Sequence, residues 1–568
     1  MINPASKISK SNQHLDLSKS LSVAYFCMEF ALDDDYGIYS GGLGILAGDM
    51  LHQANDSKAR LAGIGLAYSL TYKQKLAEDG RQIEEDIPID PEANGLTKIT
   101  DSSSKPIEIT IPIQDRQVKI QAWIKKIGQT SIILLDTNVP ENSTADQNIT
   151  NQLYTGDREH RLLQEMVLGI GGVRILHAMG LEPDVYHMNE GHSAFLSLEV
   201  ANHYKRHHKD IDFNSALQKC GQKVVFTNHT LVAAGRDVFS FDLVSTYLLE
   251  YAKEIEIPVD QIVKMGTIED TSLFSMNMMA LRNACRTNAV SKYHAEKAKE
   301  IWTNHPLIPI TNGIHIPRWT SPHKAALIET GLTDQSGKDF WLAHQQDKED
   351  LISYVQEHTQ KTIPQDALII SWARRFVSYK RPLALFWQLD WLEQIIKDSP
   401  VPIHFLFGGK LHPNNDEGKE LMSQVVNLSK GDLFKDHLTF VPNYNLEVAK
   451  YLVRGSDVWL NTPIEGYEAC GTSGMKTALN GVLQCSTNDG WVREVDWSEI
   501  GWILDSEHIS ESLYETIEKQ IVPLFADRQD DYPKEWVQRM IKSSNISKNG
   551  YSAERMLSDY YTQLYGAE

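Results

Sequence analysis

Glu468-Ala-Cys-Gly-Thr-Ser-Gly-Met-Lys476 comes after the apolar run Val458-Trp-Leu460 and indicates a strand, a loop of small residues and a helix that carries a lysine. Backbone N–H groups at the start of a helix bind phosphate, and a lysine close by can reach the same group. Loops that follow parallel strands are where α/β folds hold their ligands. The stretch therefore predicts an α/β protein with a site for a phosphorylated ligand.

Short β-branched or aromatic runs alternate with longer amphipathic segments along the chain, which predicts βαβ units around parallel sheets. Strands are expected at Val23–Phe30, Ser131–Leu135, Val185–His187, Lys223–Thr227, Ala367–Ser371, Ile403–Phe407, Leu438–Val441 and Val458–Leu460. Apolar residues four apart predict a helix at Ile509, Leu513, Ile517 and Ile521, and a second helix is expected over Ala553–Leu564.

The segment Ile308–Pro317 carries two prolines around a glycine turn and predicts a hinge, so we place a domain boundary near residue 312. We expect a disordered polar tail over residues 1–20, an N-terminal domain over 21–312 and a C-terminal domain over 313–568. The C-terminal helices are candidates to pack back on the first domain. Two open α/β domains that face each other would form a ligand cleft at the carboxyl ends of their strands.

Composition limits the classes of function. A formal charge of -20 argues against nucleic acid or an acidic membrane as the main partner. Five scattered cysteines without metal-ligand spacing predict neither a disulfide framework nor a metal site, and they suit a reducing cytoplasm. The polar start of the chain predicts no signal peptide, and no apolar run is long enough to cross a membrane.

Glycines and polar residues follow several predicted strands of the first half. Gly41-Gly42-Leu43-Gly44 precedes an apparent helix, so its amides could approach a phosphate, although such a turn is structural about as often. His187–His192 and Phe226–Thr230 each place polar side chains directly behind an apolar strand. One histidine at such a place is usually structural, but two polar strand ends in one domain favour a site.

In the second half, Arg374, Arg375, Lys380 and Arg381 follow the apolar run 367–370. A charge run is often a solvated face, but cations at the end of a buried strand are costly to desolvate without anions. Two phosphate groups would supply those anions. Gly408-Gly409-Lys410 and Asn443-Tyr444 end two further predicted strands.

Taken together, these motifs resemble the α-glucan phosphorylases, the family of glycogen, starch and maltodextrin phosphorylases, and look most like its short bacterial and archaeal form. The matching segments, between residues 23 and 495, are Ala24–Glu29, Gly41–Gly44, His187–Phe195, Phe226–Phe239, Thr311–Trp319, Ala373–Pro382, Phe407–Pro413 and Val441–Gly490. The resemblance implies a GT-B type glycosyltransferase fold, in which two Rossmann-like domains face each other across a cleft.

The same resemblance implies retaining phosphorolysis of an α-1,4-glucan at its non-reducing end, with inorganic phosphate as acceptor and glucose 1-phosphate as product. It implies pyridoxal 5'-phosphate held as a Schiff base on Lys476, with the cofactor acting through its phosphate. Substrate phosphate then protonates the departing oxygen and attacks the anomeric carbon from the same face. The paired carboxylates of ordinary glycosidases are not required.

Residue roles carry over by position in the motifs. The catalytic residues implied by the resemblance are Lys476, Arg375, Lys380 and His229. Cofactor-binding positions are Lys476, Arg374, Gly42, Thr472, Tyr444 and Lys380. Substrate-binding positions are Gly41, Leu43, Glu190, His192, His229, Asn312, Glu468, Cys470 and Gly471. Arg375 and Lys380 are expected to bind the substrate phosphate and Arg374 the cofactor phosphate.

Cys470 stands where the family commonly has serine, and we expect the change to be tolerated because the contact there is through the backbone. The chain starts too late for the N-terminal regulatory segment of the larger animal enzymes, so we expect activity that is independent of AMP and phosphorylation. Whether the protein forms a homo-oligomer is left open. The alternatives are a glucan synthase of the same fold that uses a nucleotide sugar, a glycan-binding homologue without catalysis, and an α/β protein whose motifs are all structural.

Overall fold

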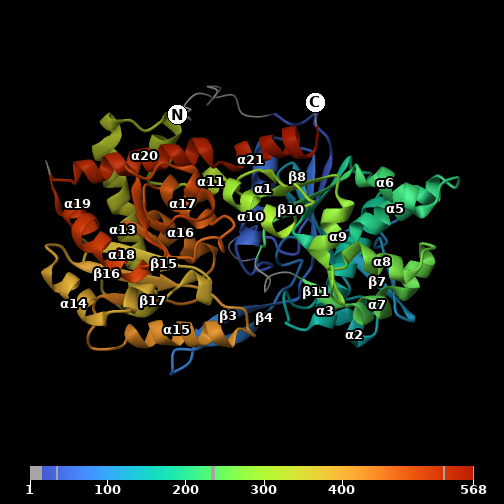
Figure 1. Ribbon diagram of the computed structural model, residues 1–568, viewed down its shortest axis with the longest axis horizontal. Helices are drawn as coiled ribbons and strands as arrows, with labels where there is room; N and C mark the ends of the chain where they lie inside the picture. Colours follow the sequence, from blue (N-terminus) through green and yellow to red (C-terminus); the bar gives the residue numbers. More distant parts are fainter. Residues whose placement is uncertain (1–15, 34–35, 232–236, 529–530, 567–568) are drawn as a thin grey trace.

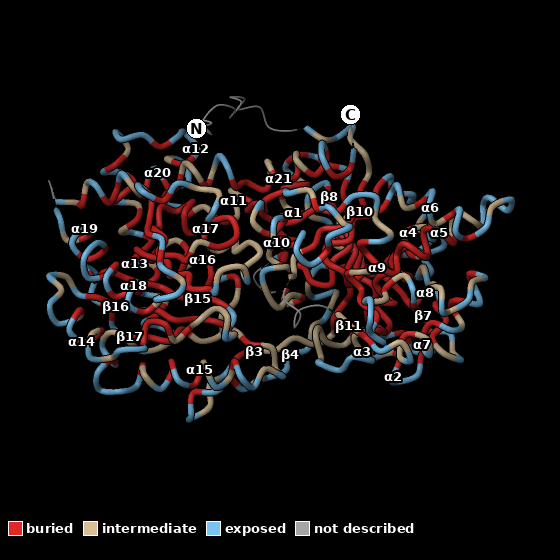
Figure 2. Tube along the Cα trace, in the orientation of Figure 1, coloured by how far each residue is buried: buried red, intermediate tan, exposed pale blue. Residues whose placement is uncertain are grey.

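The structure, a computed structural model, describes residues 16–33, 36–231, 237–528 and 531–566. Its strands form two large sheets, one from each half of the sequence, with helices packed around both (Figure 1). Each sheet has its own hydrophobic core, and Figure 2 shows the two buried regions side by side with exposed segments around them. The predicted mixed α/β fold with parallel sheets is confirmed.

Within the described residues, the first sheet has ten strands. In spatial order they are β14 (Ile308–Pro309), β13 (Arg286–Ala289), β10 (Val224–Asn228), β9 (Val185–Asn189), β1 (Val23–Phe26), β2 (Leu61–Leu66), β8 (Thr130–Asp136), β7 (Arg116–Ile127) and β5 (Thr97–Lys98), with β6 (Ile109–Ile113) paired to β7. Neighbours from β14 to β8 are parallel, whereas β7 is antiparallel to β8, β5 and β6. The order of the parallel strands reverses between β1 and β9.

The second sheet, over the part of the chain that is placed, has six strands and is parallel throughout. In spatial order they are β17 (Leu438–Val441), β16 (Ile403–Gly408), β15 (Leu368–Ala373), β18 (Val458–Asn461), β19 (Leu483–Thr487) and β20 (Gly501–Leu504). The chain order third, second, first, fourth, fifth, sixth is that of a doubly wound sheet, with its reversal between β15 and β18.

Helices connect and cover the strands. Those of the first half are α1 (Gly42–Asp56), α2 (Thr144–Gln147), α3 (Arg158–Met166), α4 (Gly172–Ala178), α5 (Leu196–His207), α6 (Phe213–Gly221), α7 (Phe241–Glu254), α8 (Val259–Gly266), α9 (Met276–Asn283) and α10 (Lys292–Ile301). The later ones are α11 (Ile316–Trp319), α12 (Ala325–Thr330), α13 (Gly337–Thr359), α14 (Leu389–Asp398), α15 (Asp416–Leu428), α16 (Leu446–Gly455), α17 (Thr472–Leu479), α18 (Ile509–Thr516), α19 (Val522–Ala526), α20 (Lys534–Gly550) and α21 (Ala553–Asp559). None of the described helices is long and apolar enough to cross a membrane.

The eight predicted strands are confirmed, with one shorter than expected. The predicted strand Val23–Phe30 ends at Phe26, because beyond it the chain bonds to a loop, where the Phe30 N–H donates to the Ile38 carbonyl (3.0 Å). Both predicted helices are also present, and each continues through a π-helical turn, at 517–521 and at 560–564. Of the predicted tail, residues 1–15 lie outside the described residues, whereas the Leu17 N–H donates to the Ser57 carbonyl (2.7 Å).

Two segments join the halves of the molecule. Side chains of α21 belong to the core of the first sheet, although this helix is the last in the chain, and Figure 1 shows it above α1. The hairpin of β3 (Leu70–Leu76) and β4 (Gln82–Pro88) comes from the first half but contacts α15 of the second. The sequence patterns did not predict this hairpin.

Candidate functional site

The predicted site residues follow the strands that flank the two reversals of strand order. In the first sheet, residues 41–44 come after β1 and residues 190–192 come after β9. In the second sheet, residues 374–380 come after β15 and Glu468 comes after β18. Because ligands of open α/β sheets bind outside the carboxyl ends of the strands at such reversals, both sheets direct their loops to a ligand site.

Lys476, on α17, is 6% exposed, and its environment is unusual for a lysine. Its Nζ lies 3.3 Å from Thr472 Oγ1 and 4.1 Å from the centre of the Trp319 ring. Burial lowers the pKa of the Lys476 amine to about 8, while the nearby charges of Asp49 and Arg318 oppose each other. A lysine with a lowered pKa is partly neutral near physiological pH and can act as a nucleophile toward a carbonyl group.

Contacts from α1 hold the ring beneath this lysine. Asp49, on α1 and 1% exposed, accepts hydrogen bonds from Trp319 Nε1 (2.8 Å) and Arg318 Nη1 (2.9 Å). The helix that begins at Gly42 is thus bonded to the Trp319 side chain, whose ring lies next to Lys476 Nζ. Asp49 could not be predicted from the sequence, because a single aspartate within an apparent helix belongs to no motif.

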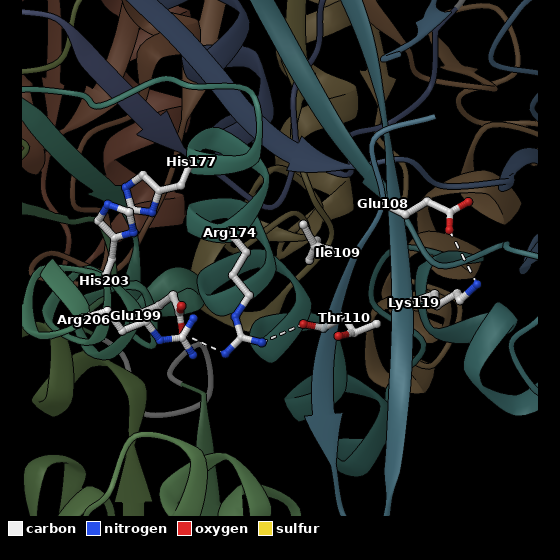
Figure 3. Close-up of a pocket in the computed structure, with 9 residues that line it drawn as sticks. All are labelled: Glu108, Ile109, Thr110, Lys119, Arg174, His177, Glu199, His203 and Arg206. Atoms are coloured by element: carbon white, nitrogen blue, oxygen red, sulfur yellow. Dashed lines mark hydrogen bonds and ion pairs between the residues drawn. The ribbon is translucent and has the colours of Figure 1, made fainter. Parts of the chain in front are cut away.

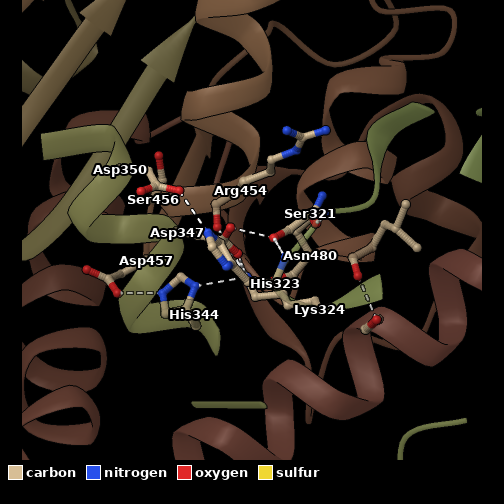
Figure 4. Close-up of polar contacts among 12 residues, drawn as sticks. Ser321, His323, Lys324, His344, Asp347, Asp350, Arg454, Ser456, Asp457 and Asn480 are labelled. Carbon is tan, nitrogen blue, oxygen red and sulfur yellow. Dashed lines mark hydrogen bonds and ion pairs between the residues drawn. The ribbon is translucent and has the colours of Figure 1, made fainter. Parts of the chain in front are cut away.

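The far end of α17 is held by a buried polar network, drawn in Figure 4. Asn480 Nδ2 donates to the carbonyls of Lys476 (2.9 Å) and Trp319 (3.0 Å). Lys324 Nζ, which is fully buried, donates to the Asn480 carbonyl (2.7 Å) and pairs with Asp347 (2.9 Å). A positive charge at the C-terminus of a helix is favourable, so this network stabilises the helix that carries Lys476.

Three of the predicted phosphate and substrate ligands meet in one cluster. Glu468 lies 3.1 Å from Arg374 Nη2 and 3.0 Å from Lys380 Nζ. Burial alone would raise the pKa of Glu468, but the charges of Arg374 and Lys380 lower it to about 2. Burial and the charge of Arg374 lower the pKa of Lys380 to about 8. Two cations share one carboxylate, so the cluster has positive charge to offer an anion.

Gly41 and Arg375 bring the two halves together. A Cβ atom added to Gly41 would lie 2.5 Å from Arg375 Nη2, so a larger residue at position 41 would displace the Arg375 guanidinium. The Gly41 N–H donates to Glu29 Oε2 (2.9 Å), so it is already paired. The helix α1 begins at the next residue, Gly42, and the amides of its first turn have no acceptor within the helix. A Cβ at Gly42 would meet no atom within 4 Å, so the space there is open. Leu43, the next residue, is partly buried and packs on the first core.

His229 is held by two residues that follow or end β9. Its Nε2 lies 2.6 Å from Asn189 Oδ1, and its N–H donates to Glu190 Oε2 (3.0 Å). Burial lowers the pKa of His229 to about 3, so the ring is neutral, and burial raises the pKa of Glu190 to about 7. Glu190 also accepts from Thr230 Oγ1 (3.0 Å). In this structure, Glu190 therefore positions the His229 loop.

His192 joins an ion-paired group. Its Nε2 lies 3.3 Å from Asp237 Oδ2, and Asp237 pairs with Arg161 (2.9 Å). Burial lowers the pKa of His192 to about 3. Residues 232–236, which fall in the matched segment Phe226–Phe239, lie outside the described residues.

Two asparagines of the matched motifs carry buried polar atoms without hydrogen-bond partners in the part of the chain that is described. Among the described residues, neither amide atom of Asn228 nor Oδ1 of Asn312 has a hydrogen-bond partner, although both side chains are buried. Such groups are rare in folded proteins and are explained by a ligand or a water. Asn228 precedes His229 directly and lies within the segment Phe226–Thr230, but no pattern in the sequence singles it out.

The remaining predicted residues lie around the cation cluster. A Cβ at Gly471 would lie 2.9 Å from Arg374 Nη2, so this loop packs against the cluster. Cys470 is partly exposed, and burial raises the pKa of its thiol. The ring of Tyr444 lies beside Gly408, where an added Cβ would come within 3.4 Å of it, and burial raises the pKa of Tyr444 to about 12.

A pocket of about 500 Å³ lies elsewhere, between β6 and β7 of the first sheet and helices α4 and α5 (Figure 3). Charged residues of its lining pair with each other, as Arg174 lies 3.1 Å from Glu199 and Lys119 lies 3.6 Å from Glu108. None of the predicted site residues is among the described residues that line it, so we assign it no role in the site.

One group of potential metal ligands occurs within the described part of the chain. Ligand atoms of His323, Asp347 and Asp350 lie within 4.8 Å of one another. Asp347 is already paired with Lys324, and His323 Nε2 lies 2.8 Å from Asp350 Oδ2. Because these groups satisfy one another, we assign no metal to them.

Comparisons with known proteins agree with one another. Residues 319–501 match the family model described as carbohydrate phosphorylase. The chain is 33% identical to the maltodextrin phosphorylase of Thermococcus litoralis, over 96% of this chain and 70% of that protein. It is 33% identical to the glycogen phosphorylase of Mycobacterium tuberculosis, with the same coverage, and 31% identical to that of Aquifex aeolicus, over 96% of this chain and 86% of the relative.

Proposed function

This chain belongs to the carbohydrate phosphorylase family, and on that premise we propose that it is an α-1,4-glucan phosphorylase. It transfers a glucosyl unit from the non-reducing end of glycogen or maltodextrin to inorganic phosphate, with retention, and releases glucose 1-phosphate. The observation that carries the proposal is the cluster of Arg374, Lys380 and Glu468 at one sheet's strand ends, together with the buried amine of Lys476. Neither a glycan-binding module nor a nucleotide-sugar synthase needs that amine.

We propose that Lys476 holds pyridoxal 5'-phosphate, because its surroundings fit an aldehyde cofactor. Its hydrogen-bond partner in the described structure is the hydroxyl of Thr472 rather than a carboxylate, and its pKa is about 8. Arg374, Thr472 and Tyr444 would hold the cofactor, and the open space at Gly42 leaves room near the first turn of α1. When bound, the cofactor would supply a phosphate group that exchanges a proton with the substrate phosphate.

The residues of the chain would neutralise the charge of the substrate phosphate and orient it toward the sugar. Arg375 and Lys380 would bind the substrate phosphate and lower the repulsion between two phosphate groups in a site that excludes water. The substrate phosphate donates a proton to the departing 4-oxygen as the bond from that oxygen to the anomeric carbon breaks. A phosphate oxygen then bonds to the same carbon from the same face. Arg375 and Lys380 would hold the phosphate dianion next to the anomeric carbon, where the positive charge of the transition state develops.

Polar side chains of both halves would bind the hydroxyl groups of the sugar. Asn312 Oδ1 is buried without a hydrogen-bond partner among the described residues, which suits a glucosyl hydroxyl. Neutral His229, fixed by Asn189 and Glu190, and Glu468 would take further hydroxyls. Cys470 and Gly471 would contribute backbone contacts, and Gly41, Leu43 and His192 would border the pocket.

We also propose that the two sheets are the centres of two Rossmann-like domains of GT-B type that face each other across a cleft, with the boundary near residue 312. Two separate cores and the same strand order in both parallel sheets support this division. The five cysteines, all of which are described, are free, which suits the reducing cytoplasm that we propose.

Phosphate dependence is the direct test. The purified protein is given maltodextrin with and without inorganic phosphate, and glucose 1-phosphate is measured. We expect release only with phosphate, and we expect Lys476→Ala to lose both the pyridoxal absorbance and turnover. Chain extension from ADP-glucose or UDP-glucose would support the synthase instead, and full activity of Lys476→Ala would refute the assignment of the cofactor.

A further inference from the structure

The β3–β4 hairpin carries two glutamines that contact loops of the other half of the molecule. Gln82 Nε2 donates to the Leu411 carbonyl (2.9 Å), and its Oε1 accepts from the Leu411 N–H (2.9 Å). Gln74 Nε2 donates to the Gly409 carbonyl (2.8 Å) and to Gln82 Oε1 (2.8 Å). Both side chains are buried, so they pair with backbone groups that water does not reach.

Gln74 also contacts a second loop. Its Oε1 accepts from the Asn443 N–H (2.7 Å), and its own N–H donates to Asn443 Oδ1 (3.3 Å). Asn443 has a φ of 56°, in the left-handed region that side chains other than glycine rarely adopt. Asparagine adopts this region more readily than most residues, and the two contacts with Gln74 fix it in this conformation directly before Tyr444.

The loop at Gly409 supports Arg374. The Arg374 N–H donates to the Gly408 carbonyl (3.0 Å), and a Cβ at Gly409 would lie 2.1 Å from the Arg374 carbonyl oxygen. The backbones are thus in direct contact, and a shift at Gly409 would move Arg374. The Gln74 side chain therefore bonds both to Gly409, whose backbone contacts Arg374, and to Asn443, which precedes Tyr444.

We propose that Gln74 is a positioning residue, which fixes the loops of Arg374 and Tyr444 from the opposite half of the chain. This inference rests on the proposed function, because it assigns both loops to the cofactor and phosphate site. The Gln74 amide donates to one loop and accepts from the other, so removing it leaves the buried Gly409 carbonyl and the partly buried Asn443 N–H without these partners. Small displacements of such groups reduce catalysis strongly, since productive geometry is narrow.

Other contacts of the hairpin serve as a comparison. Asn427 Nδ2, on α15, donates to the Asp79 carbonyl at the turn of the hairpin (2.9 Å). This contact joins the same two parts of the molecule but touches neither the Gly409 loop nor Asn443. Asn427→Ala is therefore a matched control for a hairpin that only holds the two halves of the molecule together.

The test compares the wild-type protein with three variants. Gln74→Met keeps the volume of the side chain but not its amide, and Gln74→Glu keeps an acceptor for the Asn443 N–H. Asn427→Ala is the control. Pyridoxal phosphate binding to cofactor-free protein is titrated by absorbance, and KM for phosphate and for maltodextrin are measured separately at saturating cofactor. For Gln74→Met we expect the Kd for pyridoxal phosphate and the KM for phosphate to rise about tenfold or more, with the maltodextrin KM changed less than about twofold. Gln74→Glu should show a smaller loss, and Asn427→Ala none.

The outcomes separate the two proposals. A wild-type protein that binds pyridoxal phosphate but shows no phosphate-dependent release would refute the proposed function, while the absorbance titration still tests Gln74. Unchanged cofactor and phosphate constants in folded Gln74→Met would overturn the positioning role. Equal rises in both KM values, matched by Asn427→Ala, would show that the hairpin only joins the halves. If Gln74→Met does not fold, wild-type constants in Gln74→Glu overturn the proposal.

Discussion

Replacing Lys476 by methionine should make the cofactor-free protein more stable while it abolishes activity. Lys476 is buried, and its pKa falls from 10.5 to about 8. That difference corresponds to a cost of about 3 kcal/mol for keeping the charged amine in the folded state. The attraction of the ammonium group to the Trp319 ring, 4.1 Å away, offsets about 1 kcal/mol of the gain. Lys476→Met should therefore gain about 2 kcal/mol, or about 2 °C in melting temperature for a chain of this size.

The stability difference between Lys476→Met and the wild type should depend on pH. At pH 7, about one unit below the folded pKa, Lys476 is mostly protonated in the folded and the unfolded protein, so nearly the full cost is present. Between pH 8 and 10.5 the folded protein releases the proton while the unfolded chain keeps it, and wild-type stability gains from this group as pH rises. The advantage of Lys476→Met should thus be largest at pH 7 and small near pH 10.5.

The assay is thermal melting of cofactor-free wild-type protein, Lys476→Met and Lys476→Arg at pH 7 and pH 10.5. Arginine keeps the charge, so Lys476→Arg should gain nothing at either pH. A lower melting temperature for Lys476→Met at pH 7, or a difference from wild type that is the same at both pH values, would refute the reasoning. Either result would mean that the amine is not held at a cost to the fold.

Three further predictions concern the same half of the molecule. Glu468→Gln leaves Arg374 and Lys380 without a counter-charge, so the cofactor-free variant should lose about 3 kcal/mol of stability. Added phosphate should raise its melting temperature more than that of the wild type. Equal shifts of the melting temperature with phosphate would contradict this. Cys470→Ser should keep most of the phosphorolytic activity, because the expected contact is through the backbone, and loss of most activity would show that the thiol itself matters. Lys324→Met leaves Asp347 buried and unpaired and should cost about 3 to 5 kcal/mol in melting experiments, and a variant that melts like wild type would show the pair to be dispensable.

The site was predictable where the signal is local in sequence. The cations at 374–380 and the lysine at 476 follow apolar strands directly, and the structure brings Arg374, Lys380 and Glu468 together as the strand ends suggest. Glu29 ends the matched segment Ala24–Glu29, and it accepts the Gly41 N–H. Asp49 and Gln74 gave no such signal, because one polar residue in an amphipathic helix or strand has the same appearance whether it is solvated or buried. Their partners, Trp319 and Asn443, lie hundreds of residues away.

By itself the sequence determined the parallel α/β class, the strand positions and the residue types at the strand ends, because hydrophobic periodicity and small-residue loops act over a few residues. Tertiary structure alone decided that Lys476 is buried over Trp319 with a lowered pKa, that Arg375 approaches Gly41, and that α21 packs in the first core. Desolvation and charge pairing depend on which distant segments exclude water from a group, and no local pattern encodes that neighbourhood.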